Sequence, residues 1–265
     1  MFEEMKRFLR HSFIYTVGNI LNRGAAFILL PLYTHYLSPS DFGILSLLYV
    51  TTYVVRVLLS MGISHATLRF YFEFDREEDR KQVISTCLFA SFLFGVLGIV
   101  LLFPFLGLAS EALFHSAVYV RLFQITFLTL LLEIMIEVAQ AFIRAKEYSA
   151  LYVAVSVLQL LAKVAFNIFT VVILKKGVEG ILWGNMASVA LIGMALVPIT
   201  LRYSGFHFDV PKLKAVLRYS FPLVPGFLLG MVTATTDRFF LTRYSSLSVV
   251  GLYSLALNFA VLISV

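Results

Sequence analysis

The sequence predicts an all-α polytopic membrane protein built on a parallel six-helix repeat, and three observations lead to this fold class. Of the 265 residues, 60% are hydrophobic and 14% are charged, with a mean hydropathy of +0.91. Polar residues are therefore too few to cover a water-soluble globule of this length. Several apolar runs reach the roughly 20 residues that cross a bilayer as a helix. The opening stretch, residues 12–47, recurs further along the chain.

The apolar runs predict seven complete spans and the start of an eighth. They lie at about 13–35, 42–64, 83–106, 117–141, 150–173, 179–201 and 219–242, and the eighth begins near 248. The first run is longer than the roughly 7 to 15 apolar residues of a secretory signal peptide, so we expect it to stay as a helix. Because the chain stops at Val265 within the eighth run, we expect it to be the front part of a longer, two-lobed molecule.

The repeat has an offset of 208 residues and needs no gap. Around the turn that follows the first span, the matched positions are small, polar or turn-forming: Tyr36 with Tyr244, Ser38 with Ser246, Ser40 with Ser248, Gly43 with Gly251, and Ser46 with Ser254. Six spans separate the copies, so both enter the membrane in the same direction, as in transporters whose two halves surround an axis along the membrane normal. We predict a six-helix transmembrane lobe over residues 1–210 and the first helices of a second lobe over 211–265.

The Lys and Arg residues of the loops predict the topology. One set of loops carries most of them: Lys6, Arg7, Arg10, Arg69, Arg76, Arg80, Lys81, Arg144, Lys146, Arg202, Lys212, Lys214 and Arg218. The other set has only Lys175, Lys176 and Arg243 well clear of the spans. Since short loops rich in Lys and Arg stay in the cytoplasm, the N-terminus is expected to be cytoplasmic. Topology thus explains the net charge of +6, which is no argument for a nucleic-acid partner.

Ionisable residues inside the spans are the candidate functional residues. A charge at the bilayer centre costs roughly 2.5 to 3.5 kcal/mol, so each must face a cavity, a partner or the interface. Arg23 lies half-way along the first span, and Asn19 and Asn22 lie four residues and one residue before it. Residues four apart share a helix face. We expect these three side chains to line a water-filled cavity, with a structural hydrogen-bonded cluster as the alternative.

The fourth and fifth spans carry polar stripes that can face each other. The fourth has Glu133, Glu137 and Gln140, and the fifth has Gln159, Lys163 and Asn167. In one interpretation, an ion pair between Lys163 and Glu133 holds the two antiparallel helices together. In the other, these groups line the same cavity as Arg23 and exchange partners as it opens and closes. Arg56 in the second span either joins them or extends its side chain to the interface.

Asp237 and Arg238 lie in the outer half of the seventh span. Adjacent helix positions point about 100° apart, so the two cannot face one partner. One is expected to line the cavity while the other pairs within the bundle. Asn185 in the sixth span is a weaker candidate, which we assign to packing.

The sequence shows no constellation of catalytic residues. The histidines, His11, His35, His65, His115 and His207, fall at span ends without metal-ligand spacing. Glu133 and Glu137 lie on one helix with no nucleophile beside them. Cys87 is the single cysteine and can form no internal disulfide. We therefore predict no enzyme activity, no bound metal and no cofactor.

Four motifs resemble the polysaccharide-biosynthesis (Wzx-type) oligosaccharide flippases of the MOP superfamily. They are PLYTHYLSPSDFGILSL at 31–47, RFYFEFD at 69–75, SFPLVP at 220–225 with DRFFL at 237–241, and GLYSLA at 251–256. The resemblance implies two six-helix lobes around a cavity, in a multi-pass protein of the cell's inner (plasma) membrane. It implies that a polyprenyl-diphosphate-linked oligosaccharide moves from the inner to the outer leaflet by alternating access, for cell-surface polysaccharide synthesis. Basic residues would suit the diphosphate, and Arg23 and Lys163 fit that role.

Three alternatives stay open. A multidrug or cation antiporter of the same superfamily would favour a carboxylate in the first helix, where this chain has Arg23. A major-facilitator transporter also has parallel six-helix halves, but the loop after the second span lacks its Gly-x-x-x-Asp-Arg pattern. A membrane enzyme of surface-glycan assembly, a polymerase or an acyltransferase, would need a large outer loop or a His-Asp pair. The expected partners are the lipid-linked oligosaccharide, membrane lipids and polysaccharide-assembly proteins, with no nucleic acid.

Overall fold

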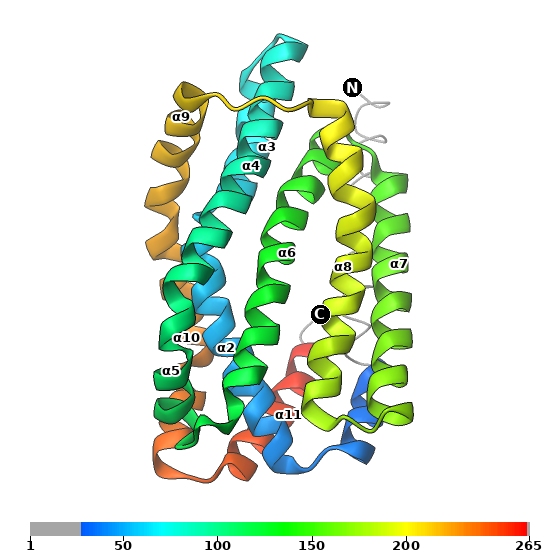
Figure 1. Ribbon diagram of the computed structural model, residues 1–265, viewed down its shortest axis with the longest axis vertical. Coiled ribbons are helices and arrows are strands. Elements are labelled where there is room, and N and C mark those ends of the chain that lie inside the picture. Colours follow the sequence, from blue (N-terminus) through cyan, green and yellow to red (C-terminus); the bar gives the residue numbers. More distant parts are fainter. Residues whose placement is uncertain (1–27, 264–265) are drawn as a thin grey trace.

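The computed structural model describes residues 28–263, and this part of the chain consists of helices joined by short turns, without a β-strand. In chain order they are a first helix, described over 28–36, then α2 (Pro39–Ser60), α3 (Ile63–Glu73), α4 (Glu77–Leu102), η1 (Phe103–Phe105), α5 (Leu106–Phe114), η2 (Ala117–Tyr119), α6 (Val120–Ala145), α7 (Ser149–Asn167), η3 (Ile168–Ile173), α8 (Gly177–Ser204), α9 (Val210–Ser220), η4 (Phe221–Leu223), α10 (Val224–Tyr244) and α11 (Leu247–Ile263). They form an elongated bundle (Figure 1). The predicted all-α fold class is confirmed.

Six stretches of the described chain are long and apolar enough to cross a membrane as helices: Pro39–Glu73, Glu77–Phe114, Ala117–Ala145, Ser149–Ile173, Gly177–Ser204 and Val210–Tyr244. They correspond to the second to seventh predicted spans. The helix α4 begins at Glu77 rather than near 83, because hydropathy detects only the part of a helix that lies within the hydrocarbon layer. The first predicted span lies mostly outside the described residues, and α11 begins where the eighth was expected.

The turn that recurs in the sequence is a helix N-terminus. Ser38 caps α2: its hydroxyl accepts from the Asp41 backbone N–H at 3.3 Å, and the Asp41 carboxylate accepts from the Ser38 N–H at 2.9 Å. Pro39 occupies the first helical turn, where its missing N–H costs nothing. At the matching position, the Ser246 carbonyl accepts from the N–H groups of Val249 and Val250 to begin α11. The Ser38 carbonyl likewise accepts from the N–H groups of Asp41 and Phe42, so the two copies share the backbone start of their helices, while Val249 replaces the capping Asp41 in the second copy.

The core lies on α6, which stands in the middle of the bundle in Figure 1. Phe123, Leu130 and Ile134 on this helix are fully buried. By contrast, Leu101 at the end of α4 and Leu108 on α5 are 70% and 63% exposed. Large apolar side chains that face outward this far are expected on a bundle whose solvent is lipid.

Within residues 28–263, the loops rich in Lys and Arg lie together at one end of the bundle (Figure 1). Ion pairs join three of them: the Lys146 ammonium is 2.9 Å from Glu77, and the Lys212 ammonium is 2.7 Å from Asp79. The turns before α2 and α11 lie at the opposite end (Figure 1). That the basic end faces the cytoplasm stays a prediction, as does the division into lobes at residue 210.

Candidate functional site

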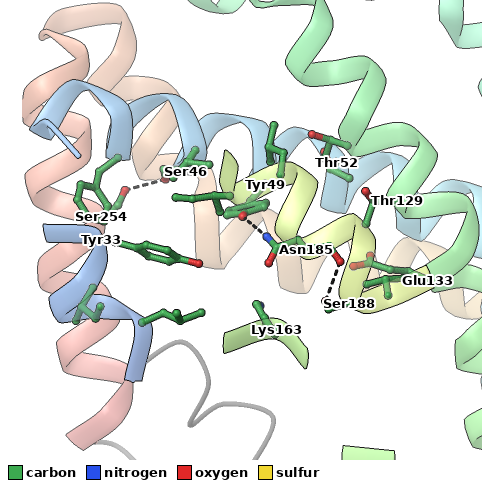
Figure 2. Close-up of a pocket in the computed structure, with 18 of the residues that line it drawn as sticks. Tyr33, Ser46, Tyr49, Thr52, Thr129, Glu133, Lys163, Asn185, Ser188 and Ser254 are labelled. Carbon is green, nitrogen blue, oxygen red and sulfur yellow. Dashed lines mark hydrogen bonds between the residues drawn. The ribbon is translucent and has the colours of Figure 1, made fainter. Parts of the chain in front are cut away.

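A cavity of about 350 Å³ lies between the end of the first helix and α2, α6, α7, α8, α10 and α11. Its polar lining consists of Tyr33, Ser46, Tyr49, Thr52, Thr126, Thr129, Glu133, Gln159, Lys163, Asn185, Ser188, Arg238 and Ser254. Figure 2 shows Tyr33, Lys163 and Asn185 pointing into this space from three different helices. The cavity thus combines charged, amide and hydroxyl groups with an apolar remainder, which is typical of a small-molecule binding site.

Helical spacing brings the lining residues to the cavity. On α2 they are Phe42, Leu45, Ser46, Tyr49 and Thr52, and on α6 they are Thr126, Thr129 and Glu133. Apart from the adjacent Leu45 and Ser46, successive members of each set are three or four residues apart. The threonine hydroxyls bond within their own helices: Thr52 to the Leu48 carbonyl at 2.7 Å and Thr129 to the Ile125 carbonyl at 2.9 Å. They therefore add polarity to the wall without needing partners across it.

A chain of hydrogen bonds fixes one side of the cavity. The Tyr33 hydroxyl donates to Asn167 Oδ1 at 2.9 Å, and Asn167 Nδ2 donates to Asn185 Oδ1 at 3.3 Å. Asn185 Nδ2 in turn donates to the Tyr49 hydroxyl at 2.9 Å. Asn167 is fully buried, and a Cβ on Gly184 would lie 3.0 Å from its side chain. Four helices are therefore held in register by satisfied polar groups, which makes this wall rigid.

The ion pairs near the cavity differ from the sequence expectation. Arg56 Nε donates to Glu137 at 2.7 Å, a second nitrogen of the guanidinium bonds the same carboxylate, and a third lies 3.5 Å from Glu133. Within residues 28–263, Glu133 pairs with Arg56 and forms no ion pair with Lys163. The interpretation as a Lys163–Glu133 ion pair was therefore wrong in its partner, whereas both side chains line the cavity, as the other interpretation expected. Arg56 does not extend to the interface, because α2 packs against α6 and directs the guanidinium at both carboxylates.

Lys163 and Arg238 are the cations of the cavity wall. Lys163 lies on α7 one turn after Gln159, and Arg238 enters from α10. In the part of the chain that the structure describes, neither cation takes part in an ion pair. Gln159 Oε1 and Arg238 Nε are buried there without a hydrogen-bond partner. Buried polar groups without partners are costly, so this arrangement suits a site that a ligand completes.

Asp237 and Arg238 point in different directions. Arg238 lines the cavity, whereas the Asp237 carboxylate accepts a hydrogen bond from the Tyr253 hydroxyl of α11. It also accepts from the Arg238 backbone N–H at 2.9 Å. Asp237 therefore joins α10 to α11 and does not reach the cavity.

The remaining predicted site residues, Arg23, Asn19 and Asn22, lie outside the described residues, and their assignment to the cavity stays a prediction. Sequence reasoning missed Tyr33 and Tyr49 and assigned Asn185 to packing, although all three line the cavity. The available signal was the polar stripe on the second span, where Tyr49, Tyr53 and Arg56 follow one another at intervals of three and four residues. Aromatic residues in an apolar run do not separate a cavity face from a lipid face by themselves.

The chain is similar to a known protein family in sequence and to known transporters in structure. The family model described as "Polysaccharide biosynthesis protein" matches residues 8–265. No curated protein matches the chain. Among solved structures, an inward-facing multidrug resistance MATE family transporter of the MOP superfamily is similar with a TM-score of 0.68 and 18% identity, over 93% of this chain and 58% of that one.

Two further structures share the fold at lower similarity. An outward-facing multidrug resistance MATE family transporter gives a TM-score of 0.53 with 15% identity, over 94% of this chain and 60% of that one. A MOP superfamily transporter from Pyrococcus furiosus, described as having a binding pocket of reverse polarity, gives 0.54 with 14% identity, over 94% and 60%. The chain thus spans about three fifths of the length of these transporters. At such identities the likeness shows the fold alone.

Proposed function

Because the chain belongs to the polysaccharide biosynthesis protein family, we propose that it forms part of a flippase that moves a polyprenyl-diphosphate-linked oligosaccharide from the inner to the outer leaflet. Transport proceeds by alternating access of the cavity, with the basic end of the bundle in the cytoplasm. The protein is a multi-pass component of the inner (plasma) membrane.

The observation that carries this proposal is the pair of cations in the cavity. Lys163 comes from the predicted first lobe and Arg238 from the beginning of the predicted second lobe. Glu133 is the acidic residue of the lining, and Arg56 lies 3.5 Å from its carboxylate. The site therefore has an excess of positive charge, which suits a diphosphate: Arg binds phosphate oxygens in pairs and Lys binds them as a point charge.

The neutral part of the lining suits the sugars of such a substrate. Tyr33, Tyr49 and Asn185 present aromatic faces and hydrogen-bonding groups that the network already holds in place. Uncharged sugar hydroxyls can form hydrogen bonds with uncharged hydroxyl and amide groups of this kind. The cavity shares Tyr49 and Arg238 with a neighbouring groove of about 480 Å³ between α2 and α10, so the space extends beyond a single small head group.

The second candidate is a multidrug antiporter, favoured by the MATE fold of the solved structures. Cationic drugs would meet Lys163 and Arg238 in this cavity, and like charges at close range in a low-dielectric site repel strongly. The charge of the lining therefore favours the anionic lipid. A membrane enzyme is the weaker candidate, because the family and the fold both point to transport.

A transport assay with paired lipids tests the proposal. The complete protein, reconstituted in vesicles, is given a fluorescent polyprenyl-diphosphate oligosaccharide or the same glycolipid without the diphosphate. An impermeant quencher then measures how much of each reaches the accessible leaflet. We expect the diphosphate lipid to be moved and the neutral lipid to stay. Transport of a cationic dye together with failure to move the diphosphate lipid would instead identify a drug antiporter.

A further inference from the structure

The first helices after the recurring turn, α2 and α11, lie side by side at the end of the bundle opposite the basic loops (Figure 1). Two hydrogen bonds join them through matched residues of the repeat. Ser40 Oγ is 2.8 Å from Ser248 Oγ, and Ser254 Oγ donates to Ser46 Oγ at 2.7 Å. Each pair is separated by 208 residues, the offset of the repeat. Equivalent positions therefore meet face to face.

Between the two serine pairs the helices touch through their backbones. A Cβ on Gly43 would lie 2.1 Å from the Leu247 carbonyl oxygen, and a Cβ on Gly251 would lie 1.9 Å from the Pro39 carbonyl oxygen. Leu247 and Pro39 are also matched positions of the repeat. The contact is thus reciprocal, as in a two-fold symmetric interface, where each copy offers the same patch to the other. Only glycine allows such a close approach.

We call this contact the outer seam: Ser40, Gly43 and Ser46 on α2 with Ser248, Gly251 and Ser254 on α11. Its inner end belongs to the cavity, because Ser46 and Ser254 both line it. Figure 2 shows their hydrogen bond at the cavity wall. In the opposite direction the cavity adjoins the groove between α2 and α10, which shares Tyr53 and Phe227 with a further pocket that reaches His65 at the start of α3. Adjoining pockets therefore follow one another toward the basic end, whereas at the other end the two backbones of the seam are in contact.

We propose that the outer seam is the closed outer gate of the cavity, and that the Ser46–Ser254 hydrogen bond is the contact through which an occupant of the cavity opens it. This inference rests on transport by alternating access, as proposed above.

The chemistry of the seam fits a contact that must break and re-form. Serine and glycine bring the backbones close without interlocking side chains, so separation requires no change of rotamer in the seam. A phosphate or sugar hydroxyl beside Ser46 can replace the bond from Ser254 with one of its own. The loss of one serine–serine bond is then compensated inside the cavity, while Ser40 and Ser248 at the other end become hydrated. Two discrete arrangements of packed helices are the usual basis of such a switch.

An accessibility experiment tests the gate without reference to the cargo. In the complete protein with Cys87→Ala, Ser188→Cys places a reporter thiol in the cavity, and a membrane-impermeant maleimide is added to either face of the membrane. We expect labelling from the basic face alone. Gly43→Ala should force the seam apart and raise labelling from the opposite face at least tenfold. Gly107→Ala is the matched control, since a Cβ there has no neighbour within 4 Å. Equal outer labelling of the two glycine variants would overturn the proposal.

A disulfide keeps the proposal testable if Gly43→Ala fails to reach the membrane. Hydroxyl oxygens 2.8 Å apart at Ser40 and Ser248 are close enough for a cysteine pair to form a bond. Oxidation of Ser40→Cys/Ser248→Cys should abolish transport of the diphosphate lipid, and reductant should restore it. Full transport by the cross-linked protein would contradict the gate. If Gly43→Ala raises labelling from the outer face but the protein does not transport the diphosphate lipid, the gate is supported and the proposed cargo is rejected. If the lipid is transported but neither Gly43→Ala nor the disulfide has an effect, the cargo is supported and the gate is rejected.

Discussion

The outer seam and the cavity wall lie next to each other but differ in how far they keep the residues of the repeat. In the seam, Ser40, Gly43 and Ser46 meet identical residues 208 positions later. Deeper in the cavity wall, one pair of matched positions differs: Leu30 and Arg238 are separated by the same offset, and both line the cavity. The repeat therefore determines where the two helices stand, while substitutions that break it determine the charge of the space between them.

This difference distinguishes residues that hold the two helices together from residues that bind the ligand. The serine and glycine pairs that are kept in both copies and meet in the seam serve contact between the copies, and a change at either member should affect conformation. A residue that has no charged counterpart in the other copy, such as Arg238, serves recognition. Substitutions of the two cavity cations, of the Arg56 ion pairs, of the buried amide network and of Leu30 test this difference, from the largest expected effect to the smallest.

Removal of both cavity cations should have the largest effect. Each charge-assisted hydrogen bond contributes about 1.5 to 3 kcal/mol, so Lys163→Gln with Arg238→Gln should slow transport of the diphosphate lipid by about 100-fold or more. Membrane levels should stay normal, because neither cation forms an ion pair within residues 28–263. Lys176→Gln, at the exposed turn before α8, is the matched control and should be neutral. A fully active double variant would reject the role of the cations.

The loss of Arg56 should reduce stability rather than alter the cargo. Arg56→Met leaves the carboxylates of Glu133 and Glu137 without their cation, and a buried charge that loses its partner costs several kcal/mol. Because these side chains are about a quarter to a third exposed, we expect a smaller cost of about 2 kcal/mol. Thermal unfolding in detergent measures this.

A charge reversal sharpens the Arg56 experiment. Arg56→Glu with Glu137→Arg retains an ion pair between α2 and α6 and should recover most of the lost stability. Glu73→Ala serves as a control, since its ion pair with Arg69 is exposed and should contribute little. Equal stability of Arg56→Met and the wild type would show that this ion pair does not hold the helices together.

The buried amide network should come next. Asn167→Leu removes the partner of the Tyr33 hydroxyl and of Asn185 Oδ1. Because both groups are only partly buried, we expect a total cost of about 1 kcal/mol, at the low end of what a buried group without a hydrogen bond costs. Hydrogen exchange along α7 and α8 should increase together with the loss of stability. If the Asn167→Leu protein is as stable as the wild type, water satisfies these groups and the wall is less rigid than the structure indicates.

The smallest effect is expected when the cavity wall receives a second arginine, at the position of the first copy that matches Arg238. Leu30→Arg gives the cavity a cation at the position that matches Arg238. The added charge should strengthen binding of an anionic head group only about fivefold, since repulsion from Arg238 offsets part of the gain. Leu30→Met, a neutral replacement of similar size, is the control. A loss of affinity in the Arg variant alone would mean that the two matched positions do not face one ligand.

The sequence contained most of the fold but only part of the site. Apolar length predicted the order of the spans, and the repeat predicted that Gly43 and Gly251 are equivalent, yet only the structure showed that each lies against the other helix. Hydropathy and spacing give the depth of a residue and its helix face relative to neighbours on the same helix. They do not give the rotation of one helix against another.

That limit explains the errors at the site. Lys163 and Glu133 have compatible depths, but the packing of α2 on α6 brings Arg56 to Glu133 instead. Asn185 gave no sequence signal beyond a lone amide in an apolar run, and its bond to Tyr49 depends on how α8 faces α2. In contrast, the 100° separation of Asp237 and Arg238 is a property of a single helix. The two side chains do point in different directions, Arg238 into the cavity and Asp237 toward Tyr253.

Binding of a short-chain prenyl diphosphate to the complete, purified protein tests the central claim most directly. Calorimetry compares the wild type with Lys163→Gln/Arg238→Gln, at low and high salt. The account predicts that the double variant binds at least tenfold more weakly and that its affinity depends less on salt, because two charge contacts are gone. Equal affinity and equal salt dependence in the two proteins would contradict the claim that these cations receive the anionic head of the substrate.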